Sequence, residues 1–276
     1  KRKLDTVYIG GGTPTTLEPD QLRRLLSAIT EYFPCEELEE FTVEAGRPDS
    51  ITLEKLQAIR EFPVTRISVN PQTMNQGTLD LIGRRHTTEE VKKAFHMARK
   101  AGFTNINMDL IAGLPGETGR HMQRTMDEIV NLAPDSVTVH SLALKRAAFL
   151  NQNREQFAVA GADEVNRMIG ISHEGALAIG AEPYYRYRQK NIAGNLENVG
   201  YARKGCEGLY NSLIMEEKQT ILALGAGASS KFVFNSGDGH RIERVENVKS
   251  VKDYIERIDE MIDRKKKFLL KSENSF

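Results

Sequence analysis

Three consecutive glycines stand where a strand-like run ends. Gly10, Gly11 and Gly12 follow the β-type run Thr6–Ile9 and lead into a Thr-Pro-Thr turn that begins at Thr13. Glycine lets a strand end turn freely and lets bare peptide groups come within hydrogen-bonding distance of a ligand. The segment lacks both the Gly-x-Gly-x-x-Gly spacing and the lysine of phosphate-binding loops. We therefore expect backbone contacts to an amine or carboxylate, and the alternative is a plain β-to-α turn.

Single polar residues stand at or near the ends of later strand-like runs. Glu44 closes one run, where a carboxylate suits an ammonium group or a ribose hydroxyl, and an exposed loop position is an equal alternative. Gln72 follows the next run, and its amide can donate and accept hydrogen bonds together. Asp109 lies in an otherwise apolar run, where an unpaired carboxylate is costly, so it either serves a site or pairs with a buried arginine or loop amides. His140 ends a further run and is expected to point into the same pocket.

Arginine and cysteine positions narrow the chemistry further. Arg84 and Arg85 follow a glycine, and arginine is suited to bidentate capture of a carboxylate, so we expect one of the two to face the site. The histidines show no metal-ligand spacing. Cys35 and Cys206 are far apart in the sequence, which argues against a disulfide scaffold and against a cysteine-rich metal site.

The elements that must position these residues alternate between two periodicities. Strand-like runs are expected at residues 6–9, 40–44, 65–70, 105–111 and 135–141, with a weaker aromatic run at 183–188. Helical patterns separate them, and the clearest opens with a Thr-x-x-Glu capping box at residues 87–90. This alternation predicts an α/β fold with a parallel sheet wound as βαβ units, which gathers the residues that end its strands at one face.

Composition bounds the class of protein. Lysine plus arginine equals aspartate plus glutamate at 38 each, so no net charge points to nucleic acid. No apolar run reaches the roughly 18 residues of a membrane span, and no signal peptide is recognisable. The sequence therefore reads as soluble and cytoplasmic. Beyond residue 150 the alternation of strand-like and helical patterns weakens. We expect a barrel part at residues 1–190 and a C-terminal extension at residues 191–276. The tail of the extension, from Lys265 onward, is expected to be frayed and solvated.

Taken together, the motifs resemble those of a known family. The segments at residues 10–15, 67–72, 83–87 and 107–116, with Glu44 between the first two, occur in order and at matching intervals. They are similar to radical S-adenosylmethionine enzymes of the oxygen-independent coproporphyrinogen III oxidase family, in the form of its HemZ-like coproporphyrinogen dehydrogenase branch. Residues 187–195 and 224–229 resemble the same family's C-terminal region. The resemblance covers most of residues 5–265 and implies a partial (β/α)6 barrel, open at one side, with S-adenosylmethionine at the carboxyl ends of the strands.

The resemblance also implies roles for individual residues. Cofactor-binding positions would be Gly10, Gly11, Gly12, Thr13, Glu44, Gln72, Arg84, Asp109 and Ala143. Of these, the glycines and Thr13 would hold the methionine amine or a second cofactor molecule through the backbone. Glu44 would lie at the methionine or ribose end, and Gln72 and Asp109 at the ribose. Arg84 would pair with the cofactor carboxylate, and Ala143 would make a further backbone contact.

The cysteines depart from the family pattern. The family binds a [4Fe–4S] cluster through a Cys-x-x-x-Cys-x-x-Cys triplet, and no such triplet occurs in these residues. Cys35 and Cys206 cannot replace it, because clusters need several closely placed thiolates. The chain also begins abruptly, without an initiator methionine, at what would be the second barrel strand. We therefore expect the cluster ligands upstream of Lys1 in the full protein, and the chain alone to be inactive.

The activity that the resemblance implies is oxidative decarboxylation of coproporphyrinogen III to protoporphyrinogen IX by a 5′-deoxyadenosyl radical. The partners would be a tetrapyrrole substrate and an electron donor. Arg146, Lys145 and residues 184–188 are candidates for the substrate carboxylates by position and charge. One alternative is a haem-binding chaperone on the same scaffold, with iron held by His140, His173 or a cysteine. Another is a cluster-free barrel lyase, which the lack of a lysine inside the first five expected strands disfavours.

Overall fold

The computed structural model describes residues 3–142, 160–188, 197–236 and 239–273. Their contacts divide the chain into two compact units, Lys1–Tyr210 and Asn211–Phe276. The expected division into a barrel part at 1–190 and an extension at 191–276 stays a prediction.

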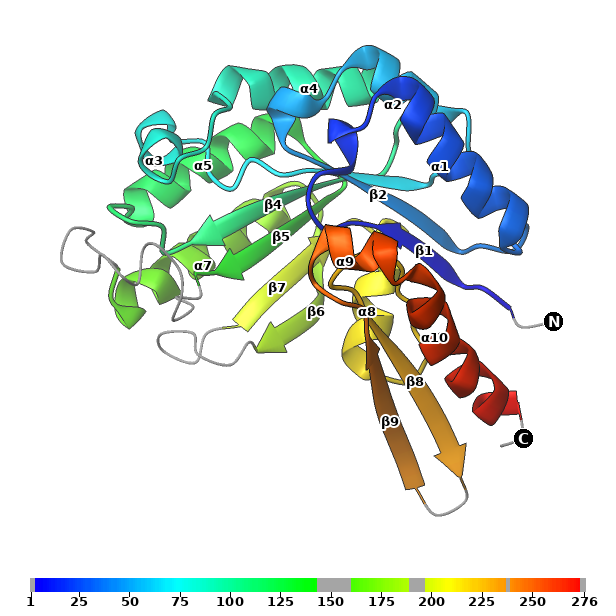
Figure 1. Ribbon diagram of the computed structural model, residues 1–276. Helices are drawn as coiled ribbons and strands as arrows, with labels where there is room; N and C mark the ends of the chain where they lie inside the picture. The colour runs from blue at the N-terminus through cyan, green and yellow to red at the C-terminus, as the bar shows by residue number, and fades with distance from the viewer. Residues whose placement is uncertain (1–2, 143–159, 189–196, 237–238, 274–276) are drawn as a thin grey trace. The chain divides into compact units, whose positions relative to one another are not determined.

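The first unit is built on one seven-stranded sheet, which curls across the unit (Figure 1) in the order β1-β2-β3-β4-β5-β7-β6. Strands β1 to β5 are parallel to their neighbours, and β7 runs antiparallel to both β5 and β6. The strands are β1 Thr6–Ile9, β2 Glu40–Gly46, β3 Arg66–Val69, β4 Ile106–Ala112, β5 Ser136–Ser141, β6 Glu182–Arg188 and β7 Glu197–Ala202. The predicted α/β class and partial barrel are thereby confirmed.

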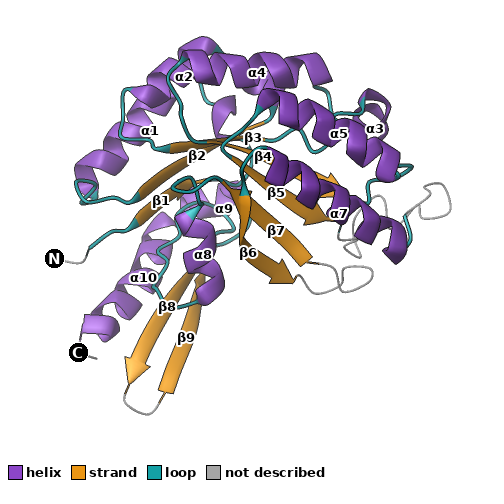
Figure 2. Cartoon of the chain, turned by 180° about the vertical axis from the view of Figure 1, so that it is seen from behind, coloured by secondary structure: helices purple, strands orange, loops and turns teal. Residues whose placement is uncertain are grey.

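Helices connect the parallel strands and cover one face of the sheet (Figure 2). They are α1 Pro19–Tyr32, α2 Leu53–Arg60, α3 Gln76–Leu81, α4 Thr88–Lys100, α5 Gly119–Leu132 and α7 Ala162–Ala178, with short 3-10 turns η1 Pro14–Thr16 and η2 Pro48–Ser50. A later helix, α8 Leu209–Glu216, begins at the end of the first unit and belongs mostly to the second. The capping box at the start of α4 forms as predicted, since Thr87 Oγ1 accepts from Glu90 N and Glu90 Oε2 accepts from Thr87 N at 2.7 Å. Caps of this kind pair backbone groups that a helix end leaves open.

The two faces of the sheet differ in chemistry because successive strand side chains point to opposite sides. On the helix side, Phe41, Val43, Ile67 and Met108 join apolar residues of the helices in one core. We call the other side the inner face. It carries Tyr8, Glu40, Thr42, Glu44, Arg66, Ser68, Asn107, Asp109, Ser136, Thr138 and His140.

The weak sequence pattern after residue 150 left one strand of the sheet unpredicted. No strand was expected at β7, yet β7 pairs with β5 and displaces β6 to the edge of the sheet. The pattern is hidden because Gly200 interrupts the short β7 run. An ideal Cβ at Gly200 would lie 2.0 Å from the Tyr185 ring, so glycine is needed where β6 and β7 meet.

The second unit is a small hairpin with two helices. Strands β8 Ser229–Ser236 and β9 Gly239–Glu246 pair antiparallel, and helices α9 Val251–Glu256 and α10 Ile258–Glu273 follow. Phe232 is buried and stacks on Phe268 at 5.3 Å between ring centroids. Arg257 separates the two helices.

The expected frayed tail is also wrong for Lys265. Its side chain is buried in α10, where Nζ donates to Asn247 Oδ1 at 2.5 Å and to Met261 O at 3.3 Å. Burial lowers the pKa of this ammonium group. Among the described helices of both units, none is long and apolar enough to cross a membrane.

Candidate functional site

The glycine turn after β1 is held in place from both sides. Gly11 and Gly12 have φ of 80° and 68°, in the left-handed region that favours glycine. Just beyond them, Thr15 is buried and its Oγ1 donates to Ala45 O at 2.5 Å, which fastens the turn to the end of β2. Lys55 Nζ adds a hydrogen bond to Thr15 O at 2.8 Å. The Thr-Pro-Thr part therefore anchors the turn, and the glycine backbone is left to meet a ligand.

Glu44 lies directly against this turn. Its Oε2 accepts from Gly11 N at 3.3 Å, and its Oε1 accepts from Asn70 Nδ2 at 3.3 Å. An ideal Cβ at Gly10 would come within 2.7 Å of Glu44 Oε2 and 2.2 Å of the Tyr8 ring, so that position needs glycine. Burial, reinforced by the charge of Asp109, raises the pKa of the Glu44 carboxyl, while hydrogen bonds from Gly11, Tyr8 and Asn70 act in the opposite direction.

Asp109 faces the same side from β4 and belongs to a chain of hydrogen bonds across strands. Asn107 Nδ2 donates to Asp109 Oδ1 at 2.6 Å, and Thr138 Oγ1 donates to Asn107 Oδ1 at 3.1 Å. The sequence left open whether Asp109 pairs with a buried arginine or with amides, and a side-chain amide is its partner. This arrangement fixes the carboxylate on the inner face.

Gln72 is attached to Asp109 through the backbone. Gln72 N donates to Asp109 O at 3.0 Å, and Ile111 N donates to Gln72 O at 2.9 Å. Its φ of 68° lies in the left-handed region, which is uncommon for a residue other than glycine. Such backbone strain is found most often at ligand sites.

Arg84 lies near the loop that follows β2. It is half-buried and forms no ion pair with any residue that the structure describes. Burial and the nearby charge of Arg47 lower the pKa of its guanidinium. Next to it Arg85 is exposed, so the two arginines differ in burial, and that one of them faces the site stays a prediction. His86 anchors this segment, because it is fully buried and its Nε2 lies 3.3 Å from Pro71 O, in the loop after β3.

Tyrosine rings close in on the inner face. Tyr8 stacks on Tyr210 with 4.5 Å between ring centroids, and Tyr185 contacts Tyr184 edge-on at 4.9 Å. Burial, together with nearby charges that include Asp109, raises the pKa of both Tyr8 and Tyr185, so both remain neutral phenols. The site thus combines carboxylates and backbone amides with apolar ring surfaces.

The structure brings Gly10, Gly11, Glu44, Gln72 and Asp109 together at or next to the inner face. Arg84 stands apart, since no direct contact joins it to Glu44 or Asp109. Ala143, Lys145 and Arg146 lie outside the described residues. Whether these residues bind a cofactor stays a prediction.

Sequence reasoning missed Tyr8 and Arg66, which share the inner face with the predicted residues. Their signal was present as alternation, because polar and apolar residues take turns along β2, β3 and β5. The two histidines considered as iron ligands lie in different places. His140 follows Thr138 by two residues and shares the inner face, whereas His173 lies on α7 and contacts Tyr201 at 5.7 Å between ring centroids.

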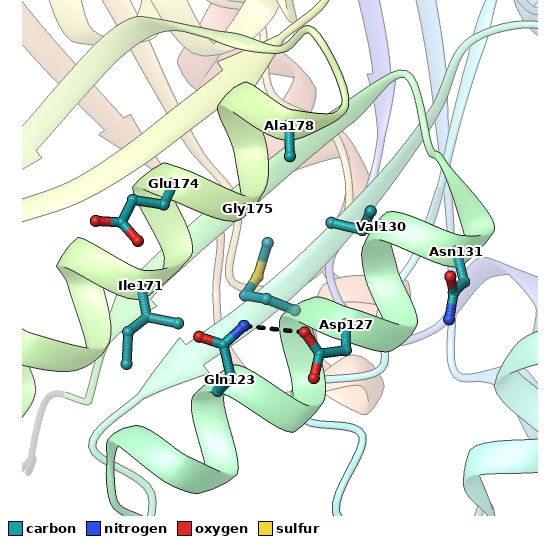
Figure 3. Close-up of a pocket in the computed structure, with 9 residues that line it drawn as sticks. Gln123, Asp127, Val130, Asn131, Ile171, Glu174, Gly175 and Ala178 are labelled. Carbon is teal, nitrogen blue, oxygen red and sulfur yellow. Dashed lines mark hydrogen bonds between the residues drawn. The ribbon is translucent and has the colours of Figure 1, made fainter.

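A surface hollow of about 380 Å³ lies elsewhere, between α5 and α7 (Figure 3). Gln123 donates to Asp127 at 2.9 Å along its polar rim, and Met126 packs closely against Gly175 in its floor. Because both helices belong to the helix side of the sheet, this hollow is separate from the glycine turn and Glu44.

A cluster of iron and sulfur does not fit the residues present. Cys35 and Cys206 are both free thiols, and burial raises the pKa of each, which disfavours the thiolate. Among the described residues no group of three or more metal-ligating side chains comes together. S-adenosylmethionine fits better, because the bare Gly11 and Gly12 backbone and two fixed carboxylates can meet its ammonium, carboxylate and ribose groups.

A curled, mainly parallel sheet with polar groups at its strand ends is the architecture of a half-barrel, in which ligands bind at the carboxyl ends of the strands. Residues 1–129 match the model of the radical SAM superfamily. The chain belongs to this superfamily, and within it to the family of oxygen-independent coproporphyrinogen III oxidase-like proteins that its motifs predicted.

Two curated relatives from Bacillus subtilis illustrate the range of that family. The chain is 45% identical over 268 residues to the oxygen-independent coproporphyrinogen-III oxidase-like protein HemZ, which covers 97% of this chain and 53% of the relative. It is 32% identical over 260 residues to the haem chaperone HemW, which covers 93% of this chain and 63% of the relative. The chain therefore spans between half and two thirds of the length of these relatives.

A solved structure shows the same fold. Coproporphyrinogen III oxidase (HemN) from Escherichia coli superposes with a TM-score of 0.70 at 22% identity, over 93% of this chain and 57% of that chain. The comparison supports the half-barrel architecture.

Proposed function

We propose that the protein to which this chain belongs is a radical S-adenosylmethionine enzyme that decarboxylates coproporphyrinogen III in the cytoplasm. The observation that carries the proposal is Glu44, which is held between the backbone amide of Gly11 and the side-chain amide of Asn70 and is close enough to Asp109 to respond to its charge. Family membership supports the reaction class, and the likeness to HemZ supports the tetrapyrrole substrate.

The chain's own residues would bind and orient S-adenosylmethionine. The Gly11 carbonyl and the Gly12 backbone suit its ammonium and carboxylate, and Glu44, which already accepts from Gly11 N, can also accept from the ammonium. Gln72 and Asp109, joined through their backbones, suit the two ribose hydroxyls. The half-buried Arg84, without an ion-pair partner in the described chain, suits the carboxylate.

When bound and reduced, this cofactor supplies the radical that takes a hydrogen atom from the substrate. Each propionate then loses one hydrogen atom and carbon dioxide to become a vinyl group, and one electron passes to an acceptor. The protein's task is to hold the propionate carbon in position and to keep water away. The reducing cluster would need thiolates from outside these 276 residues, and no step is assigned here to Cys35 or Cys206.

The direct test uses the full-length protein, anaerobically reconstituted, with coproporphyrinogen III and a reductant. We expect 5′-deoxyadenosine and a tetrapyrrole product lighter by one carbon dioxide and two hydrogens per propionate converted, both measured by mass spectrometry. Glu44→Gln and Asp109→Asn should reduce both products together. Formation of 5′-deoxyadenosine without any decarboxylated product would contradict the assigned substrate.

A second function, haem delivery, is favoured by a different observation. The chain is 32% identical to a haem chaperone, and His140 lies half-buried on the inner face, where a haem iron ligand would be useful. Titration of the full-length protein with haem, followed by its Soret absorbance, tests this function. A spectrum that changes in His140→Ala and stays the same in His173→Ala would support it.

A further inference from the structure

Arg66 is a buried cation without a counter-ion. Its side chain at the start of β3 is only 2% exposed, and its one hydrogen bond to a described residue runs from Nη2 to Ser136 Oγ at 3.3 Å. Its Nε has no partner, and no described carboxylate lies within ion-pair distance. A guanidinium stays charged in proteins, so burial without a counter-charge is costly.

The carboxylates of the same face are engaged elsewhere. Glu40 accepts from Thr42 Oγ1 at 2.8 Å and from Leu209 N at 2.5 Å. Glu44 is held by Gly11 and Asn70, and Asp109 by Asn107, as described above. The described strands therefore supply no counter-ion for Arg66, although three carboxylates lie on the same face.

Open polar groups continue from Arg66 along β3. Ser68 Oγ and Asn70 Oδ1 are also buried without partners, in side chains that are 3% and 7% exposed. Residues at i, i+2 and i+4 of an extended segment share one face, so the three form a row about 13 Å long from Arg66 to Asn70. A row of this kind is built to meet polar atoms that do not belong to the chain.

Aromatic rings flank the row. Tyr8 is in register with Thr42 and, through it, with Arg66 across β1, β2 and β3. Tyr185 is likewise in register with Thr138 and Asp109 across β6, β7, β5 and β4. Neutral phenols cannot neutralise a guanidinium, but their ring faces suit a flat, largely apolar ligand. An acidic side arm on such a ligand would meet the unpartnered Nε of Arg66 and the neighbouring Nη2, whose hydrogen bond to Ser136 Oγ is 3.3 Å long.

We propose that Arg66 binds a carboxylate arm of the substrate and thereby selects tetrapyrroles that carry propionates. This inference rests on the proposed function and deepens it, because it names the residue that recognises the acidic arm. A planar guanidinium binds a carboxylate through two parallel hydrogen bonds, a geometry that lysine cannot reproduce.

The test measures binding by the full-length protein of two porphyrins, coproporphyrin III and its tetramethyl ester, from the change in porphyrin fluorescence. We expect Arg66→Met to weaken binding of the acid at least tenfold and to leave binding of the ester unchanged. Arg66→Lys should restore part of the affinity for the acid. Arg99→Met is the matched control, because Arg99 lies on the helix side and pairs with Asp135 at 2.6 Å.

Thermal melts separate a binding role from a structural one. Without ligand, Arg66→Met should not lower Tm, since it removes an uncompensated buried charge, whereas Arg99→Met should lower Tm and leave porphyrin binding intact. A folded Arg66→Met that binds the acid as tightly as the wild type overturns the proposal, and so does a fall in Tm with unchanged selectivity for acid over ester. Arg66-dependent binding without turnover would instead reject the proposed reaction and keep the carboxylate site.

Discussion

The helix side and the inner face of the seven-stranded sheet are made from the same strands but follow opposite rules. On the helix side, strands β1 to β5 and β7 present apolar residues that are matched by apolar residues of α1, α2, α4, α5 and α7. On the inner face the same strands present carboxylates, amides, hydroxyls and Arg66, and several of their polar atoms lack partners. One face is complete without a ligand, and the other is not.

This difference separates stability from binding within single strands. Close packing makes each residue of the helix side costly to change. Unpartnered polar atoms make the inner face costly to keep empty, because buried polar groups without hydrogen bonds destabilise the fold. Substitutions of neighbouring residues should therefore affect stability on one side and binding on the other.

The largest effect on stability is expected at Phe41, a fully buried residue of β2 on the helix side. Phe41→Ala should lower the free energy of unfolding by about 3–5 kcal/mol, because it removes a large apolar side chain and leaves a cavity. Urea unfolding measures this loss. The neighbouring Thr42, equally buried on the inner face, is the comparison, and Thr42→Ala should cost only about 1 kcal/mol for its lost hydrogen bond. Equal losses for the two variants would remove the distinction between the faces.

The next largest effect is expected at Arg84, and it concerns the free energy of binding and not of unfolding. In the full-length protein, Arg84→Ala should weaken S-adenosylmethionine binding by about 1.5–3 kcal/mol, on the order of tenfold to a hundredfold, with Tm nearly unchanged. Isothermal titration beside thermal melts measures both quantities. Arg85→Ala is the internal control, since Arg85 is exposed. If Arg85→Ala carried the loss instead, the assignment of Arg84 from the motif would be off by one residue.

Glu44 should make the ligand-free protein less stable as the pH rises. Its pKa is raised in the folded state, so the folded protein holds this proton more tightly than the unfolded chain does. Stability therefore falls as pH rises from the ordinary glutamate value of 4.5 through the raised value. In urea unfolding between pH 4.5 and 7.5, the free energy of unfolding of Glu44→Gln should not show this fall. Parallel pH profiles for variant and wild type would argue that Glu44 titrates normally.

The smallest effect is expected at His86, with the opposite sign. Burial lowers its pKa, so the folded state keeps the ring neutral while the unfolded chain takes up a proton below the ordinary value of 6.5. Stability should decrease as pH falls through 6.5 toward the lowered value, and His86→Gln should reduce this decrease. Thermal melts of the wild type and of His86→Gln at pH 5.5 and 7.5 measure this effect. If Tm falls equally in both proteins between pH 7.5 and 5.5, His86 is not the source of the decrease in stability.

Local pattern predicted much of the fold but only part of the site. The capping box at Thr87 and the glycine turn after β1 are decided by nearby residues, so the sequence alone located them. Strand β7 was missed because its place depends on pairing with β5 and on the ring of Tyr185 above Gly200, both of which are distant in sequence. Arg66 was missed because a charge at the start of a short strand reads as solvated until burial is known. Lys265 shows the same error in the second unit.

The tyrosines around the inner face have a spectroscopic consequence. The chain contains eight tyrosines and no tryptophan, so its ultraviolet emission comes from tyrosine. Tyr8, Tyr185 and Tyr210 belong to the inner-face site, and Tyr8 and Tyr210 are stacked. A porphyrin bound among these rings would take up their excitation energy, and its arrival could be followed as a loss of tyrosine emission, without any label.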